Sequence, residues 1–509
     1  MPSVPYQPAV GGGYAFVPQV GGYATGPFPG QYSGPAQGAQ QVGGEQASAG
    51  YSQGGNAPVA DQSVNLAPAG QETEDMENGE LPKNLDKFPK DFIWAIATAD
   101  FQVEGSNDVD GRGVSVWDRI REMPGRIKGD PHPNLSCEAY KKWKEDVELL
   151  KALGVSHYRF SISWSRILPT GRADQVNEAG IRYYRELCEE LVKHGIKPIV
   201  TLFHYDMPLP LYEEGGFLNP DSIDWFTEFA EVCFKHFGDL VDVWLTFNEI
   251  IFYAMFSVVP MEHLPDFSLN TDHGRWNLTA HQVPYLVAHH KLLAHARVYR
   301  LYREKFYEEQ KGLVGIISGG RFSEPISAGP EDVTATKMFQ NWHFFWINDP
   351  IFGSGDYPPA MRQRLDAMAV EEGLSTILPK FTDEEKRLLK EIVKERYSDV
   401  PVLLTENGCA DMMPASAFAD PLQDYHRVKY IREHVAEVGQ AIEKGSSVIG
   451  YTAWSLLDNF EWLDGFEMKF GLFRVDFESP EKTRTPKASA KYYQKLVSTA
   501  RGLDPKNEL

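Results

Sequence analysis

Short apolar runs, rich in β-branched and aromatic residues, alternate with longer amphipathic segments from about Phe88 onwards. Near-continuous apolar runs are typical of strands buried on both faces, and their alternation with helices indicates a parallel sheet covered by helices. The runs that predict strands lie at 92–99, 155–163, 196–203, 241–248, 313–318, 400–406 and 447–455. The segments that predict helices lie near 136–153, 178–194, 222–237, 285–307, from 330 onwards, 425–444 and 487–496.

The first predicted strand is not followed by a phosphate-binding loop. Neither G-x-G-x-x-G nor G-x-x-x-x-G-K-[ST] comes after the run at 92–99, so nucleotide-binding versions of a parallel sheet are disfavoured. Polar and charged residues instead follow many different strands, and barrels of alternating strands and helices keep their chemistry at that edge. The pattern therefore favours an α/β protein with a (β/α)8 TIM-type barrel.

Composition narrows the possible partners. The chain has 509 residues, of which 42% are hydrophobic and 24% charged, as in ordinary globular proteins. Its net charge of −21 repels phosphate backbones and disfavours a nucleic-acid partner. No apolar run reaches the ~18 residues of a membrane span, and the nearest, 250–261, contains Ser257 and Pro260. The four scattered cysteines form no CxxC pair or Cys/His cluster, so we expect neither a metal site nor a disulfide framework.

The N-terminal segment differs from the rest of the chain. It is rich in Gly, Pro, Gln, Ala and Tyr, and its first basic residue is Lys83. We expect residues 1–84 to be a disordered tail and residues 85–509 to form one catalytic barrel. The alternative for the tail is weak self-association, because Tyr interleaved with Gly and Gln forms adhesive contacts. A secretory signal needs a positive start and a continuous apolar stretch; since neither is found, a cytoplasmic location is expected.

Polar and aromatic side chains gather at the carboxyl ends of the predicted strands. Carboxylates and amides bond sugar hydroxyls in pairs, and indole rings stack on the apolar faces of pyranoses. The set therefore suits a sugar ligand. Its members are Gln102, Glu104, Arg159, His204, Tyr205, Asp206, Asn248, Glu249, Glu406, Asn407, Trp454, Asp458, Asn459, Glu461 and Trp462.

Two carboxylates on different strands suit the cleavage of a glycosidic bond. One must be protonated to assist the leaving oxygen, and the other must be ionised to attack the anomeric carbon. Glu249 and Glu406 fit this pair, and a guanidinium from Arg159 on the same rim would keep Glu406 ionised. Taken alone, each glutamate is more typical of a solvated loop; the joint pattern supports the catalytic interpretation.

At this point the chain resembles glycoside hydrolase family 1, the retaining β-glucosidases. The resemblance rests on "FQVEGS", "YRFSISWSRILPTG", "TLFHYDMPLPL", "GGFLN", "TFNEI", "LLTENG", "YTAWSLLDNFEWLDGFEMKFGLFRVDF" and "RTPKASAKYY", which follow the family's order from about Pro89 to Tyr493. It implies that Glu249 is the general acid/base and Glu406 the nucleophile, with carboxyl groups ~5–5.5 Å apart and no cofactor.

The resemblance also assigns the residues around the sugar. Arg159 supports the nucleophile, and a glutamate at 249 favours O-glycosides over thioglucosides. A carboxylate at Glu461 would repel a 6-phosphate, which favours unphosphorylated sugars. The residues implied to bind the first sugar are Gln102, His204, Asn248, Trp454, Glu461 and Trp462.

Three departures from the family pattern carry information. Tyr205 stands for the tryptophan of "HWD" and Ile250 for the proline of "NEP". More seriously, only "EIVK" separates "LPKFTDEEKRLLK" from "ERYSDVPVLLTENG" between Phe381 and Pro401, where the family has a further strand with an Asn-Tyr-Tyr signature. The chain is therefore expected to be a barrel without its sixth strand unit, which closes as seven strands, fills the gap with a loop or stays open.

The expected activity is that of a β-glucosidase. It would remove terminal β-D-glucosyl residues with retention from cellobiose-like or aryl glucosides, with β-galactosides as a second substrate class. The alternative is an inactive or weakly active carbohydrate-binding protein, made so by the missing strand through a recent shortening or an incorrectly spliced or incorrectly assembled transcript. No residue pattern assigns an oligomeric state.

Overall fold

Parallel strands and covering helices build the body of the protein. The structure is a computed structural model and describes residues 79–132, 134–256, 276–394, 401–411, 420–504 and 509. The parallel strands are β1 (Ile93–Ala97), β2 (His157–Ser161), β3 (Lys197–Phe203), β4 (Val243–Phe247), β5 (Leu313–Gly315), β6 (Val402–Asn407) and β7 (Val448–Trp454). An antiparallel hairpin of β8 (Phe473–Val475) and β9 (Arg484–Pro486) follows them.

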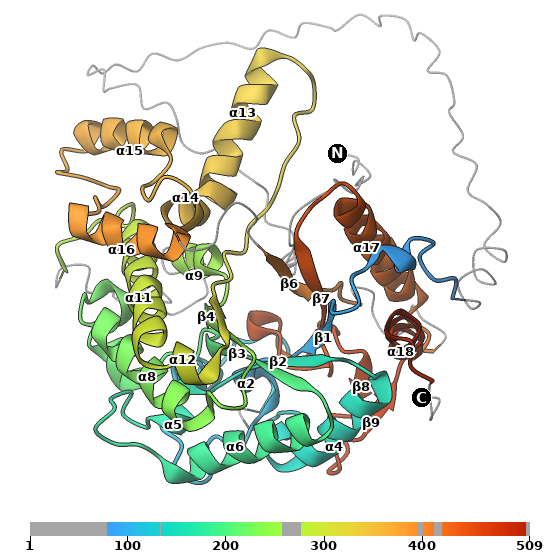
Figure 1. The fold of residues 1–509 in the computed structure, drawn as a ribbon. Helices are drawn as coiled ribbons and strands as arrows, with labels where there is room; N and C mark the ends of the chain where they lie inside the picture. The colour runs from blue at the N-terminus through green and yellow to red at the C-terminus, as the bar shows by residue number, and fades with distance from the viewer. Residues whose placement is uncertain (1–78, 133, 257–275, 395–400, 412–419, 505–508) are drawn as a thin grey trace, which may run out of the picture. The chain divides into compact units, whose positions relative to one another are not determined.

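Most of the helices surround the outer side of this sheet (Figure 1). The longer ones are α4 (Ala139–Leu153), α6 (Glu178–Lys193), α8 (Ser222–Phe237), α11 (Val283–Lys305), α13 (Pro330–Gln340), α15 (Pro359–Glu371), α16 (Asp383–Lys394), α17 (Tyr425–Glu443) and α18 (Ala488–Arg501). The shorter ones are α2 (Asp100–Val103), α3 (Val116–Arg121), α5 (Trp164–Ile167), α7 (Leu209–Glu213), α9 (Ile250–Phe256), α12 (Tyr307–Gln310) and α14 (Trp346–Phe352). Single turns occur at Leu85–Lys87, Gly216–Leu218, Asn341–Phe345 and Trp462–Asp464.

The strand order shows how the chain deals with its missing unit. The sheet runs β5-β4-β3-β2-β1-β7-β6, and every neighbouring pair is parallel. Within the described residues β5 and β6 do not pair, so the sheet stays open between them. This confirms the predicted (β/α)8 TIM-type barrel without its sixth strand and shows that the described strands do not close as a seven-stranded barrel. The loop expected to fill the gap would fall on residues 395–400, which lie outside the described residues.

The two edge strands differ from the strands between them. β1, β2 and β4 are buried along their whole length, whereas β5 is half-buried throughout and only three residues long. β6 begins with Val402, which is 42% exposed, and its ladder with β7 contains register shifts. A cavity of about 160 Å³ lies at the opening, with Leu313 of β5 and Leu403 of β6 among its lining residues.

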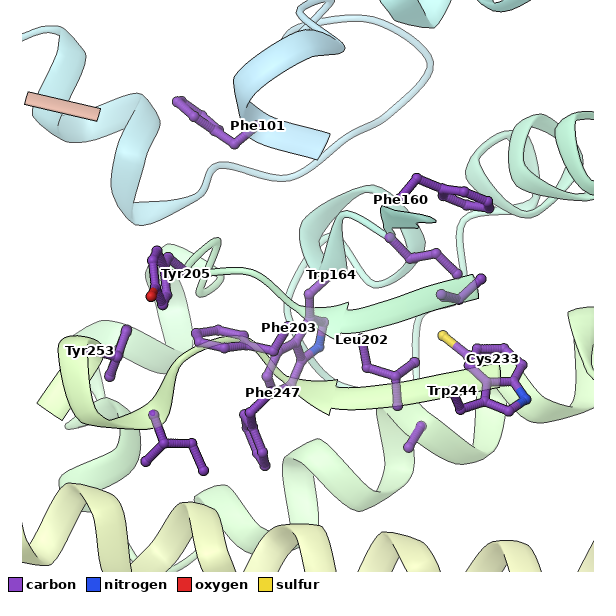
Figure 2. Packing of buried hydrophobic residues seen from close by; sticks show 14 of the residues in the cluster. Phe101, Phe160, Trp164, Leu202, Phe203, Tyr205, Cys233, Trp244, Phe247 and Tyr253 are labelled. Carbon is purple, nitrogen blue, oxygen red and sulfur yellow. The ribbon is translucent and has the colours of Figure 1, made fainter. Parts of the chain in front are cut away.

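Most of the buried apolar residues form two separate clusters, one on each face of the curved sheet. The larger cluster lies between strands and helices and contains fully buried rings such as Trp164, Trp244 and Phe203. Figure 2 shows several of these side chains around β3 and β4. The smaller cluster, inside the barrel, contains Ile199 and Leu245. It is left open on the β5–β6 side.

The predicted tail falls mostly outside the described residues, which begin at Gly79. From there the chain contacts the last helices: Lys495 donates to the Gly79 carbonyl at 3.1 Å, and the Asn84 amide donates to the Ala436 carbonyl at 2.8 Å. None of the described helices is long and apolar enough to cross a membrane.

Lys291 on α11 is an unusual feature of the outer core. It is fully buried, and its Nζ has no hydrogen-bond partner among the described residues. The ammonium lies 3.6 Å from the ring centre of Tyr253 and 4.5 Å from that of Phe203. Burial holds the pKa of Lys291 well below its usual range. The folded protein therefore binds this proton less tightly than the unfolded chain does.

Replacing this lysine by methionine is expected to stabilise the fold. Lys291→Met should raise the free energy of unfolding at pH 7 by about 1–3 kcal/mol, because a poorly paired polar group leaves the core. Since the unfolded chain binds the extra proton, wild-type stability rises with pH toward the ordinary lysine pKa, and the difference from the variant should narrow. Denaturant unfolding at pH 7 and pH 9 measures both effects. Lys305→Met, at an exposed position of the same helix, is the control; an unchanged or lower stability in Lys291→Met would contradict the expectation.

Candidate active site

The carboxyl ends of the strands bring the predicted site residues to one rim of the barrel. Gln102 follows β1 in the short helix α2, and Arg159 lies within β2, where it is register-paired with Ala97 and Ile199. The remaining site residues come directly after β3 and β4, at the end of β6, and at or after the end of β7: His204, Tyr205, Asn248, Glu249, Glu406, Trp454, Glu461 and Trp462. All of them except Glu406 and Trp462 are buried.

Arg159 connects strands that are far apart in the sheet. Its Nη1 donates to Glu406 Oε1, its Nη2 donates to Asn248 Oδ1 at 2.9 Å, and its Nε donates to Thr201 Oγ1 at 3.0 Å. The guanidinium is 1% exposed and the Glu406 side chain 10%. A buried cation thus holds the predicted nucleophile beside the residue that precedes the predicted acid/base.

Glu249 begins the connection after β4 in an unfavourable backbone conformation. Its φ is 37°, in the left-handed region, and its side chain is 5% exposed. Such strain persists where the surrounding structure holds the residue in place, and it gathers at functional sites. The Tyr205 hydroxyl donates to Glu249 Oε2 at 3.0 Å, which fixes one of the two carboxylate oxygens.

The two glutamates have different electrostatic surroundings. Burial and the neighbouring charge of Glu406 raise the pKa of Glu249 to about 8, against the opposing effects of Tyr205 and Arg159. Burial also raises the pKa of Glu406, but the charge of Arg159 and its direct hydrogen bond oppose that rise. Glu249 is therefore the carboxyl group that keeps its proton at neutral pH, whereas the guanidinium of Arg159 favours the ionised form of Glu406.

Aromatic rings form one wall of the site. The His204 ring lies 6.0 Å from Trp454 and 5.9 Å from Trp462, with interplanar angles of 7° and 14°. Trp462 is also contacted by Trp117 at 4.6 Å. Three nearly parallel rings thus stand side by side, and the apolar faces of a sugar ring pack well against such surfaces.

Several buried polar atoms of the rim have no hydrogen-bond partner within the described residues. Gln102 uses its amide nitrogen on Phe460 O at 2.8 Å and Asn459 Oδ1 at 3.1 Å, so its oxygen remains unpaired. Burial holds the pKa of Glu461 well above its usual range, with the charge of Glu406 adding to the effect. Unpaired buried groups are rare in native proteins and are satisfied by ligands at binding sites. The unpaired atoms are Gln102 Oε1, His204 Nδ1, Glu249 Oε1 and Glu461 Oε1.

The sequence alone does not predict two contacts of the site, that of Tyr205 with Glu249 and that of Thr201 with Arg159. Tyr205 is visible in the sequence as a departure from the family pattern, but nothing there indicates that its hydroxyl reaches Glu249. Thr201, which accepts from Arg159, lies within the apolar run of β3. A polar residue inside a buried strand needs a partner, and that signal could have pointed to it. Among the described residues no group of three or more His, Cys, Asp or Glu side chains is placed to hold a metal ion.

A barrel with two unlike carboxylates, an arginine and an aromatic wall on its carboxyl rim defines a sugar-processing enzyme of the TIM-barrel class. The chain belongs to glycosyl hydrolase family 1, whose profile matches residues 84–393 and 391–502. It is thus a glycoside hydrolase. The match divides at the end of α16, where the sequence lacks the sixth strand.

Curated relatives agree with this assignment. The chain is 35% identical to Myrosinase 1 of Brevicoryne brassicae over 480 residues, covering 82% of this chain and 99% of the relative. It is 34% identical to the human cytosolic beta-glucosidase over 478 residues, covering 81% of this chain and 98% of the relative. It is also 35% identical to human lactase/phlorizin hydrolase over 474 residues, but there the 81% of this chain spans only 24% of that longer protein.

Solved structures show the same fold. The structure of aphid myrosinase superposes with a TM-score of 0.73 at 33% identity, covering 81% of this chain and 99% of the other. A family 1 β-glucosidase from the fungus Humicola insolens, determined in complex with glucose, gives a TM-score of 0.72 at 33% identity. The superposition covers 81% of this chain and 98% of the other.

Proposed function

We propose that this protein is a retaining β-glucosidase that removes a terminal β-D-glucosyl residue from the non-reducing end of its substrate. The observation that carries the proposal is the pair of carboxyl groups in unlike surroundings: Glu406 against the Arg159 guanidinium and Glu249 with its pKa raised to about 8. Retaining glycosidases need one ionised and one protonated carboxyl group. The family and the names of the relatives support glucosides as the substrate class.

The reaction follows in two displacements. In the first, a Glu406 oxygen attacks the anomeric carbon while the bond to the leaving oxygen breaks and Glu249 gives that oxygen its proton. In the second, the ionised Glu249 takes a proton from water, the water oxygen attacks the same carbon, and the bond to Glu406 breaks. Two inversions return the β-configuration, and Glu249 ends protonated as it began.

The remaining rim residues bind the sugar in this proposal. Gln102, His204 and Glu461 have unpaired polar atoms that would bond the sugar hydroxyls. Asn248 is held near the two glutamates because its Oδ1 accepts a hydrogen bond from Arg159. Trp454 and Trp462 supply the ring faces. In this role the Asn248 amide would bond the hydroxyl next to the anomeric carbon. Such contacts strengthen as the ring distorts in the transition state.

A direct assay tests the proposal. The purified protein is incubated with p-nitrophenyl β-D-glucoside, the matching β-D-galactoside and α-D-glucoside, and an aryl β-thioglucoside. Turnover of the β-glucoside, with β-glucose as the first product by NMR, is expected, and the α-glucoside should stay intact. The galactoside measures preference at the 4-hydroxyl, and the thioglucoside tests the activity that the name myrosinase suggests. Binding of glucose without turnover of any glycoside would favour the non-catalytic alternative.

The pH profile provides a further prediction. Below a pH of about 8 the Glu249 carboxyl keeps its proton and serves as the acid; above it the proton is lost and kcat/KM should fall tenfold per pH unit. The acid limb should follow the protonation of Glu406. Initial rates between pH 4 and pH 10 measure both limbs. Glu249→Gln with an activated aryl glucoside, which needs no acid, is the control: its alkaline limb should disappear, and an unchanged limb there would mean that another group titrates.

A further inference from the structure

The phenol of Tyr205 forms a direct hydrogen bond to the predicted acid/base. It lies just after β3, and its hydroxyl donates to Glu249 Oε2 at 3.0 Å, whereas Glu249 Oε1 has no partner within the described residues. One oxygen is thus tied to the protein, and the other is left for the leaving group. An acid that must protonate one particular atom benefits from such an arrangement, because small misplacements lower the rate strongly.

The surroundings of Tyr205 hold its ring firmly. The residue is 8% exposed, and its ring centre lies 5.4 Å from Trp462 and 5.8 Å from Tyr253. Figure 2 shows the ring beyond the end of β3, beside Tyr253. Its φ of 74° is in the left-handed region, an unfavourable conformation for a residue with a Cβ. A side chain that is packed on several sides and attached to a strained backbone has little freedom to leave Glu249.

The Tyr205 hydroxyl is the donor in its hydrogen bond with Glu249 over the whole working pH range. Burial, followed by the charges of Glu249 and Glu406, holds the pKa of the Tyr205 phenol well above its usual range. The phenol therefore stays protonated and always donates. A donor to a carboxylate favours the ionised form, so the contact opposes the burial that raises the pKa of Glu249.

We propose that Tyr205 is a positioning residue for the acid/base: it clamps Oε2 of Glu249, leaves Oε1 to transfer the proton, and stabilises the ionised form that serves as base in the second displacement. This inference rests on the proposed function and deepens it. A tryptophan at this position, as in the resembled "HWD" motif, has an N–H in a different place on a larger ring. The substitution therefore gives this chain a contact of its own.

Tyr205→Phe tests the inference because it keeps the ring and removes the donor. Because the lost hydrogen bond favours the ionised form of Glu249, the alkaline limb of kcat/KM should move up by about one pH unit. Turnover of an alkyl glucoside, which needs strong acid assistance, should fall more than turnover of a dinitrophenyl glucoside. Tyr253→Phe, which removes a neighbouring buried phenol that does not bond Glu249, is the matched control and should leave both quantities unchanged.

A second readout does not need turnover. The infrared difference spectrum between wild type and Glu249→Gln gives the titration of the Glu249 carboxyl band, and in Tyr205→Phe its midpoint should rise by the same amount. If wild type hydrolyses no glycoside but the midpoint rises, the proposed function fails, whereas the hydrogen bond from Tyr205 and its effect on the Glu249 carboxyl are confirmed. An unmoved midpoint in Tyr205→Phe, an equal shift in Tyr253→Phe, or an equal loss on both substrates would overturn the inference.

Discussion

Glu406→Ala is expected to abolish turnover of every β-glucoside. The variant loses the proposed nucleophile and leaves the buried Arg159 guanidinium without its carboxylate. The cation then faces the site alone and adds an unfavourable charge to a transition state that is itself positive. Release of p-nitrophenol measures the effect. Glu309→Ala, at an exposed position on α12, is the control and should keep wild-type rates.

Glu249→Ala should show a different pattern. Loss of the acid should lower turnover of substrates with poor leaving groups by about 10²–10⁴-fold, while activated aryl glucosides should still react with Glu406. Azide can enter from the face that the missing carboxyl group occupied, so it should restore part of the rate and yield the β-glycosyl azide. An α-azide from Glu249→Ala, or wild-type rates in Glu406→Ala, would show that the two roles are assigned wrongly.

Local sequence patterns predicted most of the framework. The helix expected at 222–237 is α8 with the same bounds, and the strand expected at 196–203 is β3 within one residue. Both segments are long and strongly patterned, so their local preferences and their burial agree. The run at 313–318 gave only β5, Leu313–Gly315. That strand has lost one neighbour, and a ladder cannot extend where no partner supplies its hydrogen bonds.

The positions of the site residues were easier to predict than their contacts. Parallel strands bring their carboxyl ends to one edge, so placing Asn248 after one strand and Glu406 at the end of another predicted that they share a rim. The hydroxyl of Tyr205 on Glu249 depends on the ring's direction, which follows from a φ of 74° that no sequence pattern specifies. Whether β5 and β6 would pair across the missing strand also depended on tertiary packing, which no local sequence pattern specifies.

The open sheet has physical consequences for stability and rate. β5 and β6 each face the gap with backbone groups that have no ladder partner among the described residues. Each such group costs about 1–3 kcal/mol where it is shielded from water, against a total stability of about 5–15 kcal/mol for a typical domain. The cavity at the gap is lined by Thr405, the residue before Glu406. The proposed nucleophile, Glu406, thus stands on an edge strand, held by the pairing of β6 with β7 and by Arg159.

Restoring the missing unit is therefore expected to raise both stability and activity. Inserting the sixth strand and its loop from an eight-stranded relative after Lys394, where α16 ends, should pair both open edges and fill the cavity beside Leu403. The melting temperature should rise by several degrees, and kcat/KM should rise by up to ~100-fold if the carboxylates are now ~1 Å from their best positions. An insertion of equal length made of Gly and Ser is the control and should improve neither quantity, because it supplies no apolar side chains and no strand. A chain that, as written, already matches the relative in melting temperature and kcat/KM would contradict this expectation and would mean that β7 and Arg159 alone hold Glu406 in place.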